Sequence, residues 1–249
     1  MTKEDIGQFK KEKTMKKIFS ALIFMLLSVS VFAQSDDNEI FIEQSGDTLT
    51  LYIEQDGEGN KVGGNDFSGT ATDMVITGAN LTFDIDQIGN NNLLFGTLTS
   101  ASSTYNLLFT GDSNSLDWLI GDLGTAETTT FDLDITGSSN TIDFDQGSVA
   151  NADYLDLDLA VIGSSNVFDI DVEGTNSIWN FDITGGSSNI NTEQSDGSDH
   201  EINLILDGDT ADIDITQTNG TCPVAASCSS VVNLDVTSDN ATIQILQED

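Results

Sequence analysis

The sequence predicts an all-β fold, a β-solenoid of about eight strand–turn–strand coils whose strands form two stacked sheets over residues 34–249. Three observations predict it. A Gly-x-x-Asn turn or a variant of it recurs every 22 to 32 residues, apolar residues alternate with polar ones between the turns, and proline occurs once, at Pro223. Alternation at period two indicates strands with one buried face, and a recurring unit indicates a stack of similar coils.

The turns define one uniform edge. The glycine and asparagine positions of the series are Gly57/Asn60, Gly89/Asn92, Gly111/Asn114, Gly137/Asn140, Gly163/Asn166 and Gly186/Asn189, followed by Gly208 with Ala211 and a degenerate turn at 238–241. We expect glycine to supply unusual backbone angles in these turns, and Asn or Ser to hydrogen-bond the backbone locally.

A second series of turns lies midway between the first and defines the opposite edge. These turns are tight near Gly46, Gly174 and Gly197. They are expanded into loops at 97–104, 121–130, 147–154 and 219–230. Solenoids accommodate insertions in this way, along one edge.

Side-chain alternation sets the register of each strand, because a slip of one residue would move every side chain to the other face. The inward positions predicted are Leu81, Phe83, Ile85, Gln87, Phe131, Leu133, Ile135, Asn140, Ile142, Phe144, Leu155, Leu157, Leu159, Val161, Asn166, Phe168, Ile170, Val172, Ala211, Ile213, Ile215 and Gln217. The count slips by one near Gly185 and Gly186, which predicts a β-bulge there.

Charge limits the classes of partner. The chain has 7 Lys and Arg against 42 Asp and Glu, and Lys61 is the only cation after residue 17. Nucleic acid and anionic lipid require Lys or Arg to displace counterions, so we expect no nucleic-acid partner.

The N-terminus resembles an export signal. Residues 15–33 combine a basic start, an apolar core and a small-x-small end at Val31-Phe32-Ala33. The core is too short for a membrane-spanning helix, although a membrane anchor is the alternative. Residues 1–14 form an upstream extension outside this signal, and translation starting at Met15 would exclude it. The sequence therefore predicts a secreted protein, located outside a bacterial cell or on its surface, that does not span a membrane.

Residues capable of catalysis are few. His200 is the only histidine and is predicted to lie on the surface, and no Ser/His/Asp arrangement is available elsewhere. Cys222 and Cys228 are the only cysteines, and in an exported protein we expect a local disulfide between them; a metal pair is the alternative. The sequence predicts no enzymatic activity.

Pairs of aspartates on outward positions are the one arrangement with possible metal chemistry. They include Asp132, Asp134, Asp156, Asp158, Asp169 and Asp171. One interpretation is that they maintain solubility and keep sheets from associating face to face. The other is that calcium, a hard cation that prefers oxygen ligands, bridges neighbouring carboxylates. No other cofactor is expected.

Glutamines add a further pattern. Gln44 and Gln55 each precede a turn glycine, Gly46 or Gly57, by two residues, and Gln87 repeats this before Gly89. Together with the Gly-x-x-Asn turns, this pattern resembles the curlin repeat of bacterial curli fibre subunits. Elsewhere only the Gly-x-x-Asn half of the repeat is present, with Phe109, Ile135 or Val161 at the glutamine position. The resemblance implies internal Gln and Asn ladders, export through outer-membrane secretion machinery and assembly into an amyloid-like fibre.

Two functions follow as hypotheses. The first is a structural subunit that polymerises head to tail through its uncapped ends into an extracellular fibre of the biofilm matrix or cell surface, since unpaired strand edges are templates for another copy. The second is a surface solenoid that does not polymerise and acts as an adhesin or as a calcium- or carbohydrate-binding module. Concentration-dependent assembly would distinguish the first from the second.

Overall fold

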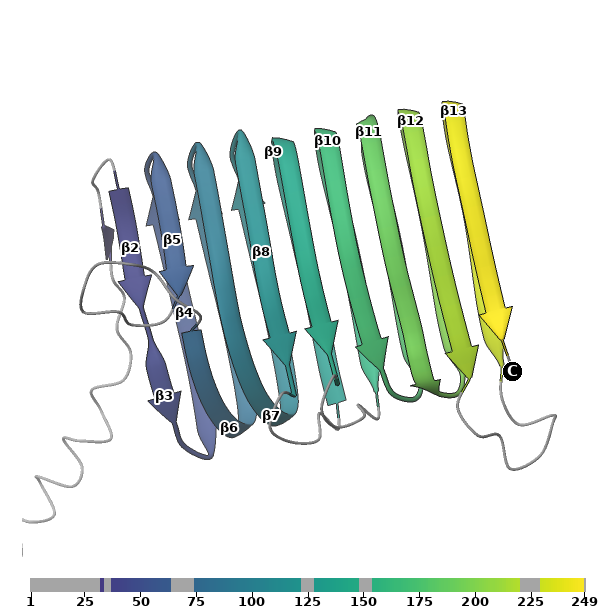
Figure 1. Ribbon diagram of the computed structural model, residues 1–249. Helices are drawn as coiled ribbons and strands as arrows, with labels where there is room; N and C mark the ends of the chain where they lie inside the picture. Colours follow the sequence, from purple (N-terminus) through teal and green to yellow (C-terminus); the bar gives the residue numbers. More distant parts are fainter. Residues whose placement is uncertain are drawn as a thin grey trace, which may run out of the picture. The chain divides into compact units, whose positions relative to one another are not determined.

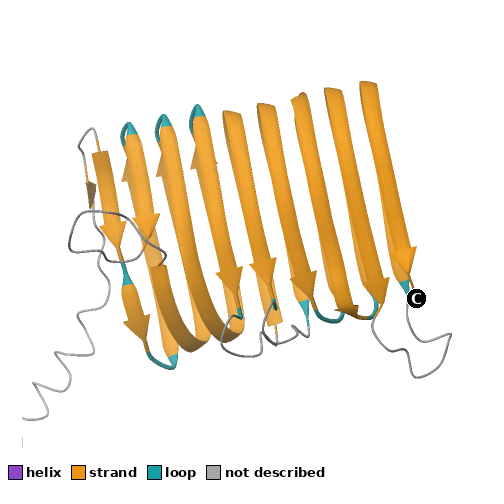
Figure 2. Ribbon diagram, in the orientation of Figure 1, coloured by secondary structure: helices purple, strands orange, loops and turns teal. Residues whose placement is uncertain are grey.

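The computed structural model describes residues 32–33, 37–63, 74–121, 128–147, 154–219 and 229–248. Strand accounts for 91% of these residues and none of them is helical, so the all-β prediction is confirmed (Figure 2). The upstream extension, residues 15–31 of the predicted export signal, and both cysteines lie outside the described residues. Phe32 and Ala33, at the end of the predicted signal, form a short strand.

Thirteen strands make up the described chain. They are β1 (Phe32–Ala33), β2 (Asp37–Phe41), β3 (Glu43–Ser45), β4 (Thr48–Asp56), β5 (Gly59–Gly63), β6 (Met74–Ile88), β7 (Asn91–Thr110), β8 (Ser113–Ile120), β9 (Thr128–Gln146), β10 (Leu155–Glu173), β11 (Ser177–Gly197), β12 (His200–Asn219) and β13 (Ser230–Glu248). Every pairing between them is parallel. The chain is therefore a β-solenoid of stacked parallel coils.

Each coil has two faces. The first face precedes the turn glycine and the second face follows it; the edge that carries these glycines is called the turn edge, and the opposite one the loop edge. In Figure 1 the coils follow one another from β2 (purple) to β13 (yellow), with the turn edge above. About seven turns are formed, where the sequence predicted about eight.

Many strands span both faces of a coil. Strands β9 to β13 contain 19 to 21 residues and run through the turn edge without interruption. The reason is that residues on both sides of the bend stay paired with the neighbouring coil, as Gly163 and Ser165 do with Gly185 and Ser187. The predicted loop at 97–104 is wrong for the same reason, because it is part of β7 and its residues 97–100 and 102–104 pair with β6.

The inward rows of both faces form one continuous core. Every inward position predicted from the alternation is buried. Large rings fill its centre, with Tyr105 contacting Phe83, Trp118 and Phe131 at centroid distances of 5.3 to 5.5 Å. Aromatic pairs at such distances add to the stability gained from burial alone.

The β-bulge is displaced from its predicted place. Pairing of β11 with β10 and with the first face of β12 is regular through Gly185 and Gly186, and the register shifts between Gln194 and Gly197, at the loop edge. The bulge therefore lies where coil lengths change.

Close stacking, not backbone angle, explains the turn glycines. Among the described glycines only Gly121 and Gly147, both at the loop edge, have a positive φ. At the turn edge, a Cβ on Gly111 or Gly137 would overlap the carbonyl oxygen of the turn glycine in the preceding coil. The expectation of unusual angles at these turns is wrong, and the side chain is excluded by the neighbouring backbone instead.

Candidate functional site

A ladder of buried side-chain amides runs along the turn edge. The Nδ2 atom of each asparagine donates to the Oδ1 atom of the asparagine in the next coil. The ladder consists of Asn38, Asn60, Asn92, Asn114, Asn140 and Asn166, with N···O distances of 2.7 to 3.0 Å. Burying these amides is tolerated because each has partners. Asn38 was not among the predicted ladder residues, because no turn glycine precedes it.

The prediction that Gly186 and Asn189 continue this series is wrong. Gly163 pairs with Gly185, so Gly185 is the turn glycine and Ser188 takes the ladder position. Asn166 Nδ2 donates to Ser188 Oγ at 3.3 Å, while Asn189 is exposed. The physical reason is that two consecutive glycines offer two possible turn positions, and only one of them requires glycine. A Cβ on Gly185 would overlap the Gly163 carbonyl oxygen, whereas a Cβ on Gly186 would have Ser164 O as its nearest neighbour, at 3.0 Å.

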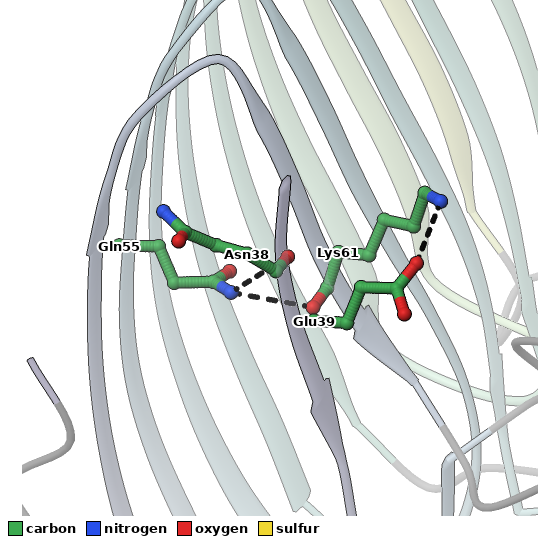
Figure 3. A network of polar contacts seen from close by, with 4 residues as sticks. All are labelled: Asn38, Glu39, Gln55 and Lys61. Atoms are coloured by element: carbon green, nitrogen blue, oxygen red, sulfur yellow. Dashed lines mark hydrogen bonds and ion pairs between the residues drawn. The ribbon is translucent and has the colours of Figure 1, made fainter. Parts of the chain in front are cut away.

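Two glutamines of the curlin-like segment stack next to this ladder. Gln87 Nε2 donates to Gln55 Oε1 at 2.8 Å. Gln55 Nε2 in turn donates to the carbonyl oxygens of Asn38 and Lys61 (Figure 3). Lys61 forms a 2.9 Å ion pair with Glu39 on the outer surface (Figure 3). Gln44 lies apart from them, since β3 places it at the loop edge beside Ile76.

A second glutamine ladder lies at the loop edge of the last three coils. Gln217 Nε2 donates to Gln194 Oε1, and Gln247 Nε2 donates to Gln217 Oε1, both at 2.7 Å. Of these residues the alternation had placed only Gln217 inward. The spacing of the three glutamines in the sequence follows the coil lengths, which is a signal that could have identified the ladder.

The C-terminal end of the stack exposes core positions. Among the described residues, β13 pairs only with β12. Ile243 and Ile245, which continue inward rows, are 42% and 46% exposed, while Ile213 and Ile215 directly beneath them are buried. The last coil therefore presents an unpaired strand edge together with an open apolar core.

The six aspartates considered for calcium do not converge. Asp132, Asp134, Asp156 and Asp158 lie on the first face, whereas Asp169 and Asp171 lie on the second. Within the described part of the chain, no group of three or more His, Cys, Asp or Glu side chains is arranged to hold a metal ion.

Stacked carboxylates repel one another. Burial, followed by the negative charges of Asp169, Glu193, Asp145 and Asp143, raises the pKa of Asp171 to about 6. The repulsion is reduced elsewhere by amides: Asn191 Nδ2 donates to Asp169 Oδ1 at 2.8 Å.

On the first face, an outward row alternates acids with apolar residues from coil to coil. In order it contains Asp86, Leu108, Asp134, Ala160, Asp182, Ile205 and Asp235. The small side chain of Ala160 leaves a hollow of about 290 Å³, lined also by Asp158, Asn180 and Ile205.

His200 is buried, in contrast to its predicted surface position, with 1% of its surface exposed. Neither ring nitrogen has a hydrogen-bond partner among the described residues. Burial lowers the pKa of His200, and Asp199 partly opposes this. The inward row that contains it also holds Ser177 and Ser230.

These features define a repeat protein of the parallel β-solenoid class, with internal amide ladders and acidic outer faces. Comparison with protein-family models, with curated proteins and with solved structures finds no match. No helix among the described residues has the length and apolar character needed to cross a membrane.

Proposed function

We propose that the chain is a secreted structural subunit that assembles head to tail into an extracellular, amyloid-like fibre of the biofilm matrix or cell surface. The observation that carries the proposal is the C-terminal end of the stack, where one edge of β13 has no partner among the described residues and Ile243 and Ile245 are exposed. An unpaired edge above an open apolar core is a template for another strand of the same kind.

The outer faces support assembly through the ends. Carboxylates such as Asp132, Asp158 and Asp169 stack on both faces, and after residue 17 the chain has only one cation, Lys61. Like charges disfavour face-to-face contact between solenoids. The ends are thus the surfaces where burial gains are greatest and repulsion is least.

Export supports the extracellular location. The signal-like segment at 15–33 and the resemblance to curlin repeats both favour secretion, with outer-membrane secretion machinery as a transient partner. Detection of the protein outside intact bacterial cells would test this part of the proposal.

Assembly can be tested with charged substitutions at the open end. In the variants Ile243→Lys and Ile245→Lys, a charge would enter the joint between copies, so we expect assembly to stop while the monomer stays folded. The matched control is Val167→Lys, whose side chain is similarly exposed at 44% but lies on the outer face. Sedimentation, thioflavin fluorescence and negative-stain microscopy measure assembly. A wild-type protein that stays monomeric at high concentration would refute the proposal.

A solenoid that binds a ligand along one face is the second candidate. The hollow beside Ala160, which combines the Asp158 carboxylate and the Asn180 amide with the apolar Ile205, favours it. Such a lining suits a carbohydrate or a hydrated calcium ion. Saturable binding that Asp158→Asn abolishes, by a protein that remains monomeric, would establish this function in place of the first.

A further inference from the structure

We propose that copies join in one fixed register, in which Gln44 of one copy continues the Gln194–Gln217–Gln247 ladder of the copy before it. The inference rests on the proposed function, because it specifies how the head-to-tail joint is made. It assigns a partner to two amides that lie at opposite ends of the same chain.

The ladder has a direction that leaves an acceptor at its end. Gln217 and Gln247 each donate to the glutamine in the preceding coil and also to a backbone carbonyl oxygen, as Gln247 does to Ser230 O at 3.1 Å. No described residue donates to Gln247 Oε1. This oxygen is therefore available to a donor in a following coil.

Gln44 has the matching donor. It occupies the same row of the loop edge in the first coil, where the next residue of the row is the apolar and fully buried Ile76. The Gln44 side chain makes no hydrogen bond within the described residues. In the described part of its own chain this half-buried amide has only an apolar neighbour and no hydrogen-bond partner, and the preceding copy would supply one.

The same alignment superposes the other inward rows. Placing Gln44 on Gln247 places Ile42 on Ile245 and Ile40 on Ile243. At the same constant sequence offset, Asn38 comes to lie on Ala241. One register thus matches the inward positions from Asn38 to Gln44 with those of the second face of β13, which are identified by the pairings within the chain.

The second face of the first coil contains no insertion that would prevent it from pairing with β13. The segment 64–73 separates β5 from β6, whereas in the first coil only Ile42 separates β2 from β3. Residues 37–45 can therefore pair with 240–248 one for one.

Outward residues favour this register as well. Glu39 would face Thr242, Phe41 would face Gln244, and Glu43 would face Leu246, so no two carboxylates lie opposite each other. A shift of two residues that moves Glu43 onto Glu248 would oppose like charges, which is destabilising.

Cysteine cross-linking tests the register. In a background with Cys222→Ser and Cys228→Ser, the pair Gln44→Cys/Gln247→Cys should give covalent multimers when assembled protein is oxidised. Facing residues on paired strands are about 4.8 Å apart, within the Cα range of a disulfide. The control pair Gln44→Cys/Leu246→Cys, with side chains on opposite faces, should remain monomeric on a non-reducing gel.

A second experiment does not depend on a disulfide. Gln44→Leu and Gln247→Leu should each raise the critical concentration for assembly roughly tenfold, because one amide is then buried unpaired. The double variant should recover most of the loss, since two leucines restore an apolar contact.

The outcomes separate the two proposals. Fibres that form without the 44/247 cross-link, or with a cross-link only in a shifted pair such as Gln44→Cys/Ile245→Cys, would overturn the register and leave the proposed function intact. Additive losses in the double leucine variant would also overturn the register. Absence of fibres in the wild-type protein would refute both.

Discussion

Asn166 donates its Nδ2 atom to Ser188 Oγ at 3.3 Å, and with this contact the asparagine ladder of the turn edge ends. Beyond it the same row holds Ala211 and Ala241. The internal amides then continue at the loop edge, from Gln194 onwards. Polar stacking therefore passes from one edge of the solenoid to the other along the chain.

The buried ladder should be important for stability. Asn114→Ala removes an acceptor of Asn92 Nδ2 (2.7 Å) and a donor to Asn140 Oδ1 (2.9 Å), and all three amides are buried. Because buried polar groups without partners are costly, we expect the free energy of unfolding to fall by about 1–3 kcal/mol. Chemical denaturation monitored by circular dichroism measures the change.

The matched control is Asn203→Ala. Asn203 also bonds to two amides, Asn180 at 2.9 Å and Asn233 at 2.7 Å, but on the outer face. Water can replace these bonds, so a change below about 0.5 kcal/mol is expected. Equal losses at the two positions would show that burial does not strengthen the ladder.

The identity of the turn glycine can be tested directly. Gly185→Ala would force a methyl group against the Gly163 carbonyl oxygen, so we expect a loss of about 1–3 kcal/mol in stability. Gly186→Ala has more space and should cost clearly less. The reverse order, measured by thermal unfolding, would place the turn at Gly186.

Lowering the pH should reduce the repulsion between the carboxylates around Asp171 on the second face. The pKa of Asp171 is raised to about 6 in the folded protein, above the ordinary aspartate value of 3.8, so the folded state binds this proton more tightly than the unfolded state. The contribution of Asp171 to stability is therefore greatest below about pH 4 and is lost as pH rises through about 6. Asp171→Asn should raise the melting temperature at pH 7 and change it little at pH 4.

The exposed turn residue Asp112 provides the control for this experiment. Asp112→Asn removes the same formal charge at the turn edge and should change the melting temperature at pH 7 less than Asp171→Asn does. If both variants shifted the melting temperature equally at pH 7, net charge and not the stacking at Asp171 would be responsible.

The contribution of His200 to stability should have the opposite pH dependence to that of Asp171. Its pKa is lowered by burial, so the folded state favours the neutral ring and stability falls as pH drops below the unfolded value of about 6.5. The groups packed around it from the adjacent coils, Ser177 and Ser230, carry no charge, and Asp199 is the one charge that offsets burial. His200→Leu, which matches Leu155 in the same row, should remove this acid sensitivity in melts at pH 5 and 8. Unchanged sensitivity would assign it to other groups.

The sequence was sufficient for the fold because alternation and turn spacing report on the same register. Inward positions such as Phe131 and Phe168 are buried as predicted, since a two-residue period leaves only two possible faces. The errors lie where the repeat is ambiguous. The Gly185–Gly186 doublet offers two turn positions, and only the contact with Gly163 decides between them.

Other site residues could not be predicted from the local sequence pattern, because their surroundings depend on how neighbouring coils align. His200 lies next to a short turn and was assigned to the surface, but its row is covered by the coils on both sides. Asn38 and the ladder ending at Gln247 become visible only when coils of unequal length are aligned. Whether the ends join, and what the outer carboxylates bind, depends on other molecules.

Parallel stacking gives the solenoid an unusual linear charge density. After residue 33 the sequence holds 39 acids and one lysine. About seven coils stack at a spacing of roughly 4.8 Å, so the stacking axis carries about one net negative charge per ångström. Double-stranded DNA has about one per 1.7 Å. By this measure the protein is a polyelectrolyte, and it must carry a condensed atmosphere of counterions whose release would drive the binding of any polycation.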